Sequence, residues 1–247
     1  LDEHFPGSIQ TDDLTQEIAD EVSPNKYDWL SVERIHKAIH AFSPNKAAGL
    51  DGIKPIVLQH LPSQMLVRLG CIYSASIDLG YVPQLWRQSK AIFIPKNGKD
   101  DYSQTRVWRP ISLMPFTFKT LERLILWHLE ETVLKEYGMH KDQHAFRKGR
   151  STESALSDVI DILESEVLRK GVAIGVFLDI QGAFDNLLPE GVIQSLANRG
   201  TPNYLLKWFK QFLLHREVIV DHRGVILKRK LLKGTPQGGV LSPIIWN

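Results

Sequence analysis

The sequence contains very little cysteine and no long apolar run, and each absence excludes a class of protein. Its 247 residues include one cysteine, Cys71, so neither a disulfide framework nor a cysteine-based zinc site is expected. The longest uninterrupted apolar stretch, residues 172–178, is much shorter than the roughly 20 residues that a membrane-spanning helix needs. No charged segment followed by an apolar one forms a secretory leader at the N-terminus. We therefore expect an intracellular protein in a reducing compartment, with no membrane partner.

Charge is distributed unevenly along the chain. The whole chain has a net charge of +2, yet residues 1–21 carry seven acidic side chains and no lysine or arginine. The remaining residues therefore carry a net charge of +9. This excess favours a polyanionic partner such as nucleic acid, although it also suits an ordinary soluble surface. Because residues 1–26 also lack apolar periodicity, we expect them to form an acidic linker.

Hydrophobic periodicity and turn residues predict a mixture of helices and strands. Apolar residues recur at helical spacing in four segments, and a further helix begins at Pro189, a residue suited to a first turn. The four segments are residues 27–42, 62–79, 111–137 and 151–170. Short strands are expected at residues 90–94, 172–178, 218–220 and 225–227, of which the last two read as a β-hairpin. The run at 172–178 is typical of a strand that is buried on both faces.

Asp179 comes directly after the apolar run at residues 172–178. A carboxylate at the end of a buried strand is costly unless it is paired or bound to a metal ion. Strand-end carboxylates that face a crevice commonly hold Mg²⁺, which prefers oxygen ligands. An isolated aspartate at such a place is also typical of a turn or a helix cap, so both interpretations stay open. Asp185, six residues later, could join the same site or fix the turn before the next helix.

The segment Gly234–Gly239 surrounds one glutamine, Gln237, with three glycines and a proline. Glycine allows a close approach of the backbone to a ligand, and the amide of Gln237 can both donate and accept hydrogen bonds. The segment lacks the Gly-Lys-Ser/Thr ending of a phosphate-binding P-loop, and ordinary turns have similar compositions.

Lys96 and Arg109, thirteen residues apart, could converge on phosphate groups. Arginine offers a bidentate fork and a stacking plane, whereas lysine offers a point charge. The alternative is a solvated basic loop.

The order of these motifs along the chain is more specific than any one of them. From N- to C-terminus the motifs are Gly49–Ile53, Lys90–Lys96, Trp108–Leu113, Gln143–Thr152, Phe177–Asp185 and Gly234–Pro243. This succession, over about residues 28–247, resembles the reverse transcriptase domain of non-LTR (LINE-type) retrotransposons. The resemblance implies an RNA-directed DNA polymerase with an α+β, right-hand polymerase fold. It also implies fingers with an N-terminal extension at residues 27–170 and an incomplete palm at residues 171–247.

The resemblance further implies a role for each matching residue near the nucleotide. Asp179 matches the first catalytic aspartate and metal ligand of the palm, and the backbone carbonyl of Ile180 would face the second metal ion. Phe184 matches the aromatic steric gate that crowds a ribose 2′-hydroxyl. Gln237 matches the glutamine beside the nucleotide sugar and the templating pair.

Other matching residues lie in the fingers or support the site. The resemblance implies that Lys96 and Arg109 grip the triphosphate, with Arg109 also stacking on the incoming base. Contacts to the RNA template are implied, more loosely, for Lys46, Gly49, Asp51, Arg147 and Arg150. Asp185 and Gly238 match positions whose role is structural.

The sequence also departs from the family pattern. These polymerases carry an aromatic-x-Asp-Asp turn downstream of the glutamine, and this sequence does not contain it. The upstream endonuclease and the downstream thumb are also missing, so the sequence looks like a fragment of a longer polyprotein that should hardly polymerise alone. The implied partners are an RNA template, a DNA primer, a dNTP, two Mg²⁺ or Mn²⁺ ions and the remaining palm, thumb and endonuclease segments. A nuclear location is expected for the full-length element protein.

Two alternatives remain open at this stage. A catalytically dead RNA-binding relic or a maturase-like splicing factor would keep the same fold, although the presence of Asp179, Phe184 and Gln237 argues against long decay. The pairs His36/His40 and His140/His144 have the i,i+4 spacing of zinc ligands. No acids or cysteines accompany these pairs in the expected pattern, so exposed helix histidines explain them better.

Overall fold

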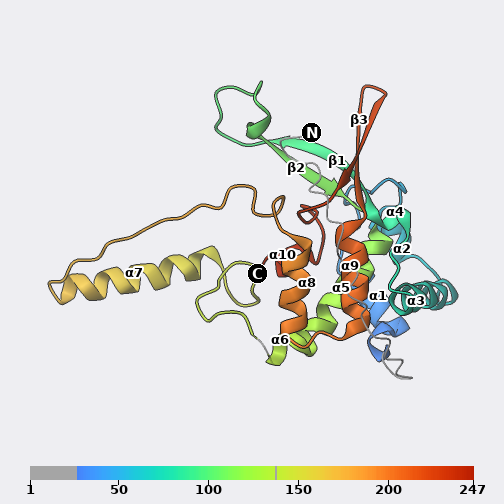
Figure 1. The fold of residues 1–247 in the computed structure, drawn as a ribbon, viewed down its shortest axis with the longest axis horizontal. Helices are drawn as coiled ribbons and strands as arrows, with labels where there is room; N and C mark the ends of the chain where they lie inside the picture. Colours follow the sequence, from blue (N-terminus) through green and yellow to red (C-terminus); the bar gives the residue numbers. More distant parts are fainter. Residues whose placement is uncertain (1–26, 137) are drawn as a thin grey trace.

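A four-stranded sheet and a group of helices packed beside it form the body of the structure (Figure 1). This computed structural model describes residues 27–136 and 138–247, so the predicted acidic linker at residues 1–26 lies outside the described residues. The strands are β1 (Gln88–Pro95), β2 (Trp108–Leu113), β3 (Arg216–His222) and β4 (Val225–Leu231). Their spatial order is β2-β1-β3-β4. The fold therefore combines helices with a mixed sheet, in agreement with the mixed helix and strand content expected from the sequence.

The sheet joins two hairpins that are far apart in the sequence. β1 runs antiparallel to β2, and β3 runs antiparallel to β4. Between the hairpins, Gln88–Lys90 of β1 pair in parallel with Glu217–Ile219 of β3. The predicted second hairpin is confirmed and is longer than expected. Its two-residue turn, Arg223 and Gly224, has positive φ angles of 52° and 81°, which suit the right-handed twist of the two strands.

Most of the predicted helices are confirmed, with one shifted boundary. The helices are α1 (Val32–His40), α2 (Pro55–Gln59), α3 (Ser63–Asp78), α4 (Gln84–Arg87), α5 (Phe116–Glu131), α6 (Val133–Glu136), α7 (Thr152–Leu168), α8 (Pro189–Asn198), α9 (Asn203–Leu214) and α10 (Ser242–Trp246). The expectation of one helix from residue 111 was wrong, because residues 111–113 complete β2. Pro115 disfavours a helical conformation at Met114 and precedes the first turn of α5, which separates strand from helix. Helix α9 was not predicted.

The core lies where α5 packs between the other helices and the sheet. The ring of Phe118 on α5 is fully buried, stacks on Trp208 with 6.0 Å between centroids and contacts Phe212 at 5.4 Å. Further fully buried side chains come from α1, α3, α5 and α9, namely Ile35, Ile39, Tyr73, Ile77, Leu121, Leu124, Ile125, Leu129 and Phe209. This cluster includes the start of α5, whereas a second, smaller cluster of Ala91, Val218 and Leu231 joins β1 to the hairpin that follows α9. Among the described residues, no helix combines the length and apolar character needed to cross a membrane.

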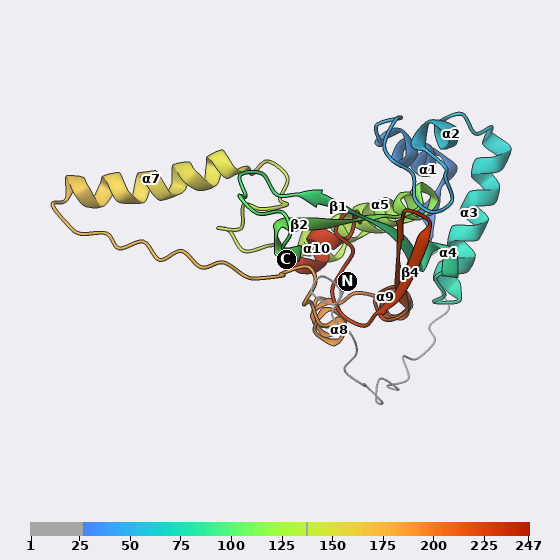
Figure 2. The same cartoon turned by 90° about the horizontal axis from the view of Figure 1, so that it is seen from above.

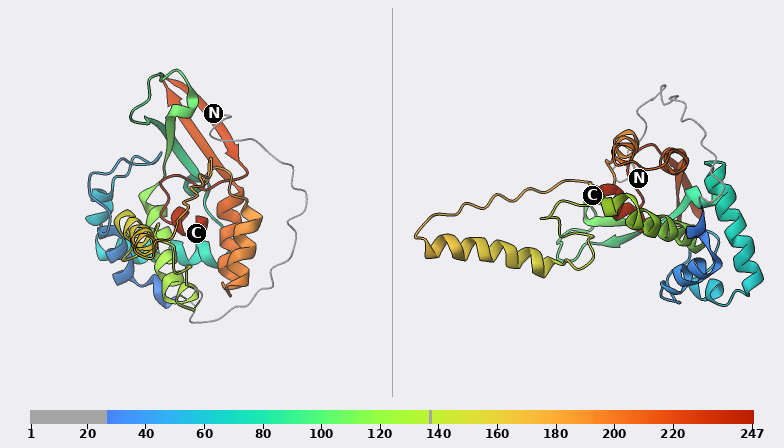
Figure 3. Two further views of the ribbon diagram at one scale, coloured as in Figure 1. Left: turned by 90° about the vertical axis from the view of Figure 1, so that its left-hand side faces the viewer. Right: turned by 90° about the horizontal axis from the view of Figure 1, so that it is seen from below.

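Helix α7 and the segment that follows it project away from this body (Figure 2). Ser151 caps α7, and its side chain accepts a hydrogen bond from the Ser154 N–H. None of the residues of α7 is buried. The right-hand view of Figure 3 shows the chain returning alongside α7 as an extended segment. The left-hand view shows the helices of the body below the sheet.

The buried strand expected at residues 172–178 is therefore wrong for this structure. The segment has no strand conformation, and Phe177 and Leu178 are 91% and 90% exposed. A β-strand needs a neighbour that pairs with its backbone N–H and C=O groups. Within residues 27–136 and 138–247, no strand pairs with this segment. The apolar composition of residues 172–178 is typical of a strand, but the segment does not form one in this chain.

The difference in burial between two phenylalanines is testable. We expect Phe118→Ala to lower the free energy of unfolding by about 3–5 kcal/mol, because it deletes a fully buried ring and leaves a cavity. Phe177→Ala is the matched control, and we expect it to change the free energy of unfolding by less than about 0.5 kcal/mol. Urea denaturation of this chain, followed by circular dichroism, measures both values. Equal losses for the two variants would contradict the burial described above.

Candidate active site

Three of the motifs that are distant in the sequence meet through their backbones. The N–H of Gly234 donates to the carbonyl of Leu187 at 2.7 Å, and the N–H of Thr235 donates to the carbonyl of Phe184 at 2.7 Å. On the other side, the N–H of Ser112 in β2 donates to the carbonyl of Gln237 at 2.9 Å. Residues 234–239, which we call the glutamine loop, therefore lie between residues 184–187 and strand β2.

Two glycines make this close approach possible. Gly234 has a φ of +81°, and a Cβ atom there would lie 2.7 Å from the carbonyl oxygen of Asp185. Gly238 has a φ of +126°, and a Cβ atom there would lie 2.8 Å from the carbonyl oxygen of Ser112. Any other residue would be strained at both positions and would collide with backbone atoms that cannot move aside. Both glycines therefore have a structural role in the loop.

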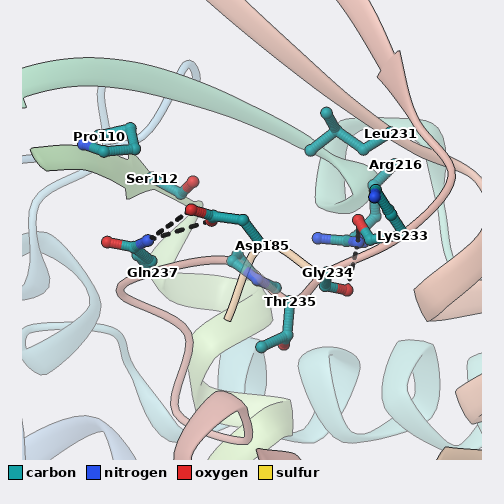
Figure 4. Close-up of a pocket in the computed structure, with 10 residues that line it drawn as sticks. Pro110, Ser112, Asp185, Arg216, Leu231, Lys233, Gly234, Thr235 and Gln237 are labelled. Atoms are coloured by element: carbon teal, nitrogen blue, oxygen red, sulfur yellow. Dashed lines mark hydrogen bonds between the residues drawn. The ribbon is translucent and has the colours of Figure 1, made fainter. Parts of the chain in front are cut away.

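The side chain of Gln237 faces Asp185 in a small cavity (Figure 4). Its Nε2 donates to both carboxylate oxygens of Asp185, at 3.0 and 3.3 Å. The cavity is lined by Pro110, Ser112, Asp185, Arg216, Leu231, Lys233, Gly234, Thr235, Pro236 and Gln237. Asp185 thus fixes the rotamer of the glutamine, which is a specific form of the structural role expected for it.

Arg216 lies on the opposite side of the same cavity from Gln237 (Figure 4). Its buried guanidinium donates to the carbonyls of Lys233 at 2.9 Å, Gly234 at 2.6 Å and Leu213 at 3.3 Å. Burial lowers the pKa of Arg216 to about 10, and the negative charge of Asp185 acts in the opposite direction. The guanidinium therefore stays charged at neutral pH.

Glu122 on α5 contacts the other end of the glutamine loop. Its carboxylate is fully buried and accepts hydrogen bonds from the N–H groups of Val240 at 3.1 Å and Leu241 at 3.5 Å. Burial raises the pKa of Glu122 to about 7. These two hydrogen bonds and the positive charges of Lys119 and Arg123 oppose that rise without cancelling it.

Phe184 lies beside the glutamine loop. Its half-buried ring contacts Phe146 edge-on at 6.1 Å and Trp246 at 6.2 Å. Its backbone carbonyl is the acceptor for Thr235. The ring thus belongs to a small aromatic group near the C-terminal helix α10.

Arg109 lies in β2, and Lys96 directly follows the end of β1. Arg109 pairs with Ile94 in the β-ladder, and the N–H of Lys96 donates to the carbonyl of Val107 at 2.8 Å. The Nζ of Lys96 donates to the carbonyl of Arg106 at 2.7 Å, whereas the side chain of Arg109 is exposed. The hairpin therefore brings the two basic residues to one end of the sheet, and neither lines the cavity of Gln237.

The predicted template residues fall on two separate loops. Gly49 packs tightly after β2, since a Cβ atom there would lie 2.7 Å from the backbone of Met114 and Pro115. In the same loop, a carboxylate oxygen of Asp51 accepts from the Ile53 N–H at 3.2 Å, and Lys46 is exposed. Asp51 therefore shapes the loop through an Asx turn.

The second loop precedes and caps α7. The guanidinium of Arg147 donates to the carbonyl of His140 at 2.9 Å, and Arg150 forms an ion pair with Asp158 at 3.6 Å. His144 also contacts Asp158, at 3.1 Å. In the chain from residue 27 onward, residue 137 excepted, no three His, Cys, Asp or Glu side chains cluster as metal ligands.

Asp179 and Ile180 lie on the exposed extended segment after α7. Neither residue lines the cavity of Gln237, where Asp185 is the neighbouring acid instead. The catalytic role of Asp179, and the shared crevice expected for Asp179 and Gln237, stay predictions.

Comparison with known proteins decides the family. A family model described as reverse transcriptase (RNA-dependent DNA polymerase) matches residues 94–247. The chain belongs to the reverse transcriptase family. It is 32% identical over 219 residues to the RNA-directed DNA polymerase from mobile element jockey of Drosophila melanogaster, covering 88% of this chain and 24% of that protein. The corresponding jockey polymerase of Drosophila funebris is 30% identical over 221 residues, covering 89% of this chain and 24% of that protein.

A bacterial protein is also similar to this reverse transcriptase chain. The group II intron-encoded protein LtrA of Lactococcus lactis is 27% identical over 238 residues, covering 94% of this chain and 35% of that protein. The chain spans about a quarter of the length of the jockey polymerases. The resemblance to non-LTR retrotransposon reverse transcriptases is thus confirmed.

Sequence reasoning missed two residues that hold the glutamine loop, Glu122 and Arg216. One signal was present for Glu122, because it stands four residues after Phe118 and three before Ile125 on the apolar stripe of its helix. A charged residue on such a stripe is buried with it and needs polar partners. Arg216 precedes the apolar residues of β3 and has no comparable signal.

The raised pKa of Glu122 predicts a pH dependence of stability. Between its ordinary value of 4.5 and its folded value of about 7, the folded chain keeps a proton that the unfolded chain has lost. This stabilising contribution is complete below the unfolded pKa and is lost as the pH rises through the folded pKa. Glu122→Gln cannot titrate, so its free energy of unfolding relative to wild type should increase by up to about 3 kcal/mol from pH 4.5 to pH 7.5.

Urea denaturation of the wild type and of Glu122→Gln at several pH values measures this difference. Parallel stability curves for the two proteins over this range would contradict the raised pKa.

Proposed function

We propose that this chain is the fingers and the first part of the palm of an RNA-directed DNA polymerase from a non-LTR retrotransposon. Residues 27–170 would form the fingers with an N-terminal extension, and residues 171–247 the start of the palm. The remaining palm, the thumb and the endonuclease would come from parts of the polyprotein outside this chain. The jockey polymerases, of which the chain spans about a quarter, have room for such segments.

The observation that carries this proposal is the convergence of three motifs at the glutamine loop. Phe184, Gln237 and strand β2 come from distant parts of the sequence, and backbone hydrogen bonds join them into one site. Asp185 holds the side chain of Gln237. A glutamine fixed in this way can recognise the sugar and the templating pair, because its amide presents a donor and an acceptor in a defined direction.

The basic end of the β1–β2 hairpin supports a role in binding the triphosphate. Lys96 and Arg109 would neutralise phosphate charge, and the planar guanidinium of Arg109 can also stack on a base. Lys46, Arg147 and Arg150 would contact the RNA backbone, while Gly49 and Asp51 shape the loop that presents Lys46. Such phosphate contacts make RNA affinity strongly salt-dependent.

The exposed apolar surface of α7 and residues 172–178 supports the assignment of an incomplete palm. This surface includes Leu156, Val167, Val172, Phe177 and Leu178, which are all exposed. Exposed apolar residues in this number usually mark a surface that another part of the protein covers. A strand from the remaining palm would pair with the extended segment and bury its side chains.

The chemistry of the donors near Asp179 fits a divalent metal ion. A carboxylate and a backbone carbonyl, from Asp179 and Ile180, are oxygen ligands of the kind that Mg²⁺ prefers, and both residues are exposed. Among the described residues no three His, Cys, Asp or Glu side chains cluster as metal ligands, so further carboxylates would have to come from elsewhere in the polyprotein. When bound, two such ions neutralise phosphate charge and favour attack by the primer 3′-hydroxyl on the α-phosphate of the dNTP.

A substitution of Asp179 tests the catalytic assignment in the full-length polymerase. We expect Asp179→Asn to lower dNTP incorporation by about 100-fold or more, because it removes a charge that stabilises the transition state. RNA affinity should change little, since it depends on many lysine and arginine contacts. Primer extension and RNA-binding assays measure the two effects.

Asp161→Asn, at an exposed position of α7, is the matched control and should retain activity. Full dNTP incorporation by Asp179→Asn would refute its role as a metal ligand.

Phe184 provides a test of substrate discrimination. A ring beneath the sugar leaves room for a 2′-hydrogen and excludes a 2′-hydroxyl. We expect Phe184→Val in the full-length polymerase to raise the efficiency of rNTP incorporation relative to dNTP incorporation, with only a moderate loss for dNTP. Single-nucleotide incorporation kinetics measure this ratio.

The competing interpretation makes Phe184 a packing residue between Phe146 and Trp246. Phe184→Val would then reduce stability by around 3 kcal/mol and impair both substrates equally. A lower melting temperature with an unchanged rNTP/dNTP ratio would therefore exclude the steric gate.

The alternative of an RNA-binding relic or a splicing factor is not favoured. The retrotransposon relatives described above are named RNA-directed DNA polymerases. The buried polar contacts around Gln237 also favour a retained nucleotide site, because such contacts have no evident use in a surface that binds RNA only through phosphates.

A further inference from the structure

Two buried charged side chains hold opposite ends of the glutamine loop. At its start, the guanidinium of Arg216 donates to the carbonyls of Lys233 and Gly234, at 2.9 and 2.6 Å. Just after its end, the carboxylate of Glu122 accepts from the N–H groups of Val240 and Leu241, at 3.1 and 3.5 Å. One residue comes from β3 and the other from α5, so the loop is held from two different parts of the fold.

Both charges direct their hydrogen bonds at the main chain. Glu122 and Arg216 are each fully or nearly fully buried, and burial of a charge is unfavourable unless polar partners compensate. An apolar residue at either position would avoid that penalty but would leave the backbone groups of the loop without partners. The arrangement therefore favours one fixed loop geometry over the greatest stability of the core.

The loop needs such support because its own composition makes it flexible. Three glycines in the loop, Gly234, Gly238 and Gly239, give the unfolded backbone many accessible conformations. A Cβ atom at Gly239 would lie 3.0 Å from a carboxylate oxygen of Glu122, so α5 approaches the loop closely. From the start of α10, the hydroxyl of Ser242 donates to the carbonyl of Pro236 in the loop at 2.7 Å.

Gln237 lies between the two held ends. Its backbone carbonyl and its side chain each have one partner, Ser112 and Asp185. A shift of either end of the loop would move Gln237 relative to Asp185, since Gln237 is only three positions from Gly234 and three from Val240. The position of the amide toward a nucleotide thus depends on the two buried charges.

We propose that Glu122 and Arg216 are positioning residues that preset the glutamine loop for the incoming nucleotide. Neither residue touches the substrate in this proposal, and both act through Gln237. The proposal rests on the nucleotide-binding function proposed above for Gln237 and adds the residues that set its geometry.

The main experiment compares Glu122→Leu with Glu122→Gln in the full-length polymerase. Leucine removes both acceptors, whereas glutamine keeps one carbonyl oxygen for the N–H of Val240. We expect Glu122→Leu to raise the KM for dNTP by about tenfold with a smaller change in kcat, because the loop must be ordered when the nucleotide binds. Glu122→Gln should restore most of the affinity for dNTP. Glu130→Leu, at an exposed position of the same helix, is the matched control and should leave KM unchanged.

Hydrogen–deuterium exchange supplies a readout that does not depend on activity. In Glu122→Leu, the amides of Val240 and Leu241 should exchange faster, while the amides paired between β1 and β2 exchange as in the wild type. Unchanged exchange at Val240 and Leu241 would overturn the proposal. Faster exchange together with an unchanged KM for dNTP would also overturn it, because the loop would then be loosened without consequence for the nucleotide.

A second variant tests the other end of the loop and guards against misfolding. Arg216→Lys keeps the positive charge but lacks the planar fork that reaches two carbonyls. We expect a higher KM for dNTP and faster exchange at Gly234, with RNA affinity retained. Equal loss of RNA affinity and dNTP affinity would indicate general destabilisation and would overturn the proposal. A wild-type polymerase that incorporates no dNTP would instead contradict the proposed function, while the exchange data would still test the loop.

Discussion

The site depends on one constraint, the close contact of three backbone segments without intervening side chains. The glutamine loop can lie against residues 184–187 and β2 only because Gly234 and Gly238 lack a Cβ atom and accept positive φ angles. Backbone groups that meet in this way satisfy one another with hydrogen bonds of 2.7–2.9 Å. Everything that faces the cavity, including the direction of Gln237, follows from this contact.

The buried charged side chains of Glu122 and Arg216 fix the geometry of the glutamine loop, and their burial reduces the stability of the fold. Glu122 lies on α5 among fully buried apolar side chains such as Leu121 and Ile125, where a leucine would pack at lower cost. Its pKa near 7 records that cost, since the neutral form competes with the form that accepts hydrogen bonds best. The protonation state of Arg216 does not change near neutral pH, because its guanidinium keeps its charge even when burial lowers its pKa to about 10.

Local sequence signals predicted those parts of the fold that depend on local interactions. The hairpin of β3 and β4 depends on neighbouring residues and is confirmed. The prediction of a strand at residues 172–178 was wrong, because a strand also needs a neighbouring strand to pair with. The periodicity of a segment does not show whether such a partner is present. The predicted start of α5 was wrong because the apolar pattern of β2 continues into the helix. Only Pro115 marks the boundary.

The sequence predicted several residues of the candidate site, but it did not predict most of the contacts between them. The order of motifs identified Phe184, Asp185, Gln237 and Gly238 before any geometry was known. The partnership of Asp185 with Gln237 across 52 residues could not be read from spacing. The contacts of Glu122 and Arg216 could not be predicted either. Both side chains bind backbone atoms, which every residue has, so the identity of the contacted residues gives no signal.

The parallel pairing of β1 with β3 sets an order of events during synthesis of the protein. Gln88 and Glu217, which are bonded through their side chains, are 129 residues apart. At about 5–20 residues per second, a ribosome takes on the order of ten seconds to make the intervening chain. During that time the β1–β2 hairpin has an open edge, because the only strand that pairs with β1 on that side in the described structure has not yet emerged. An unpaired edge of this kind can pair with another chain, so the hairpin stays open to such pairing until β3 appears.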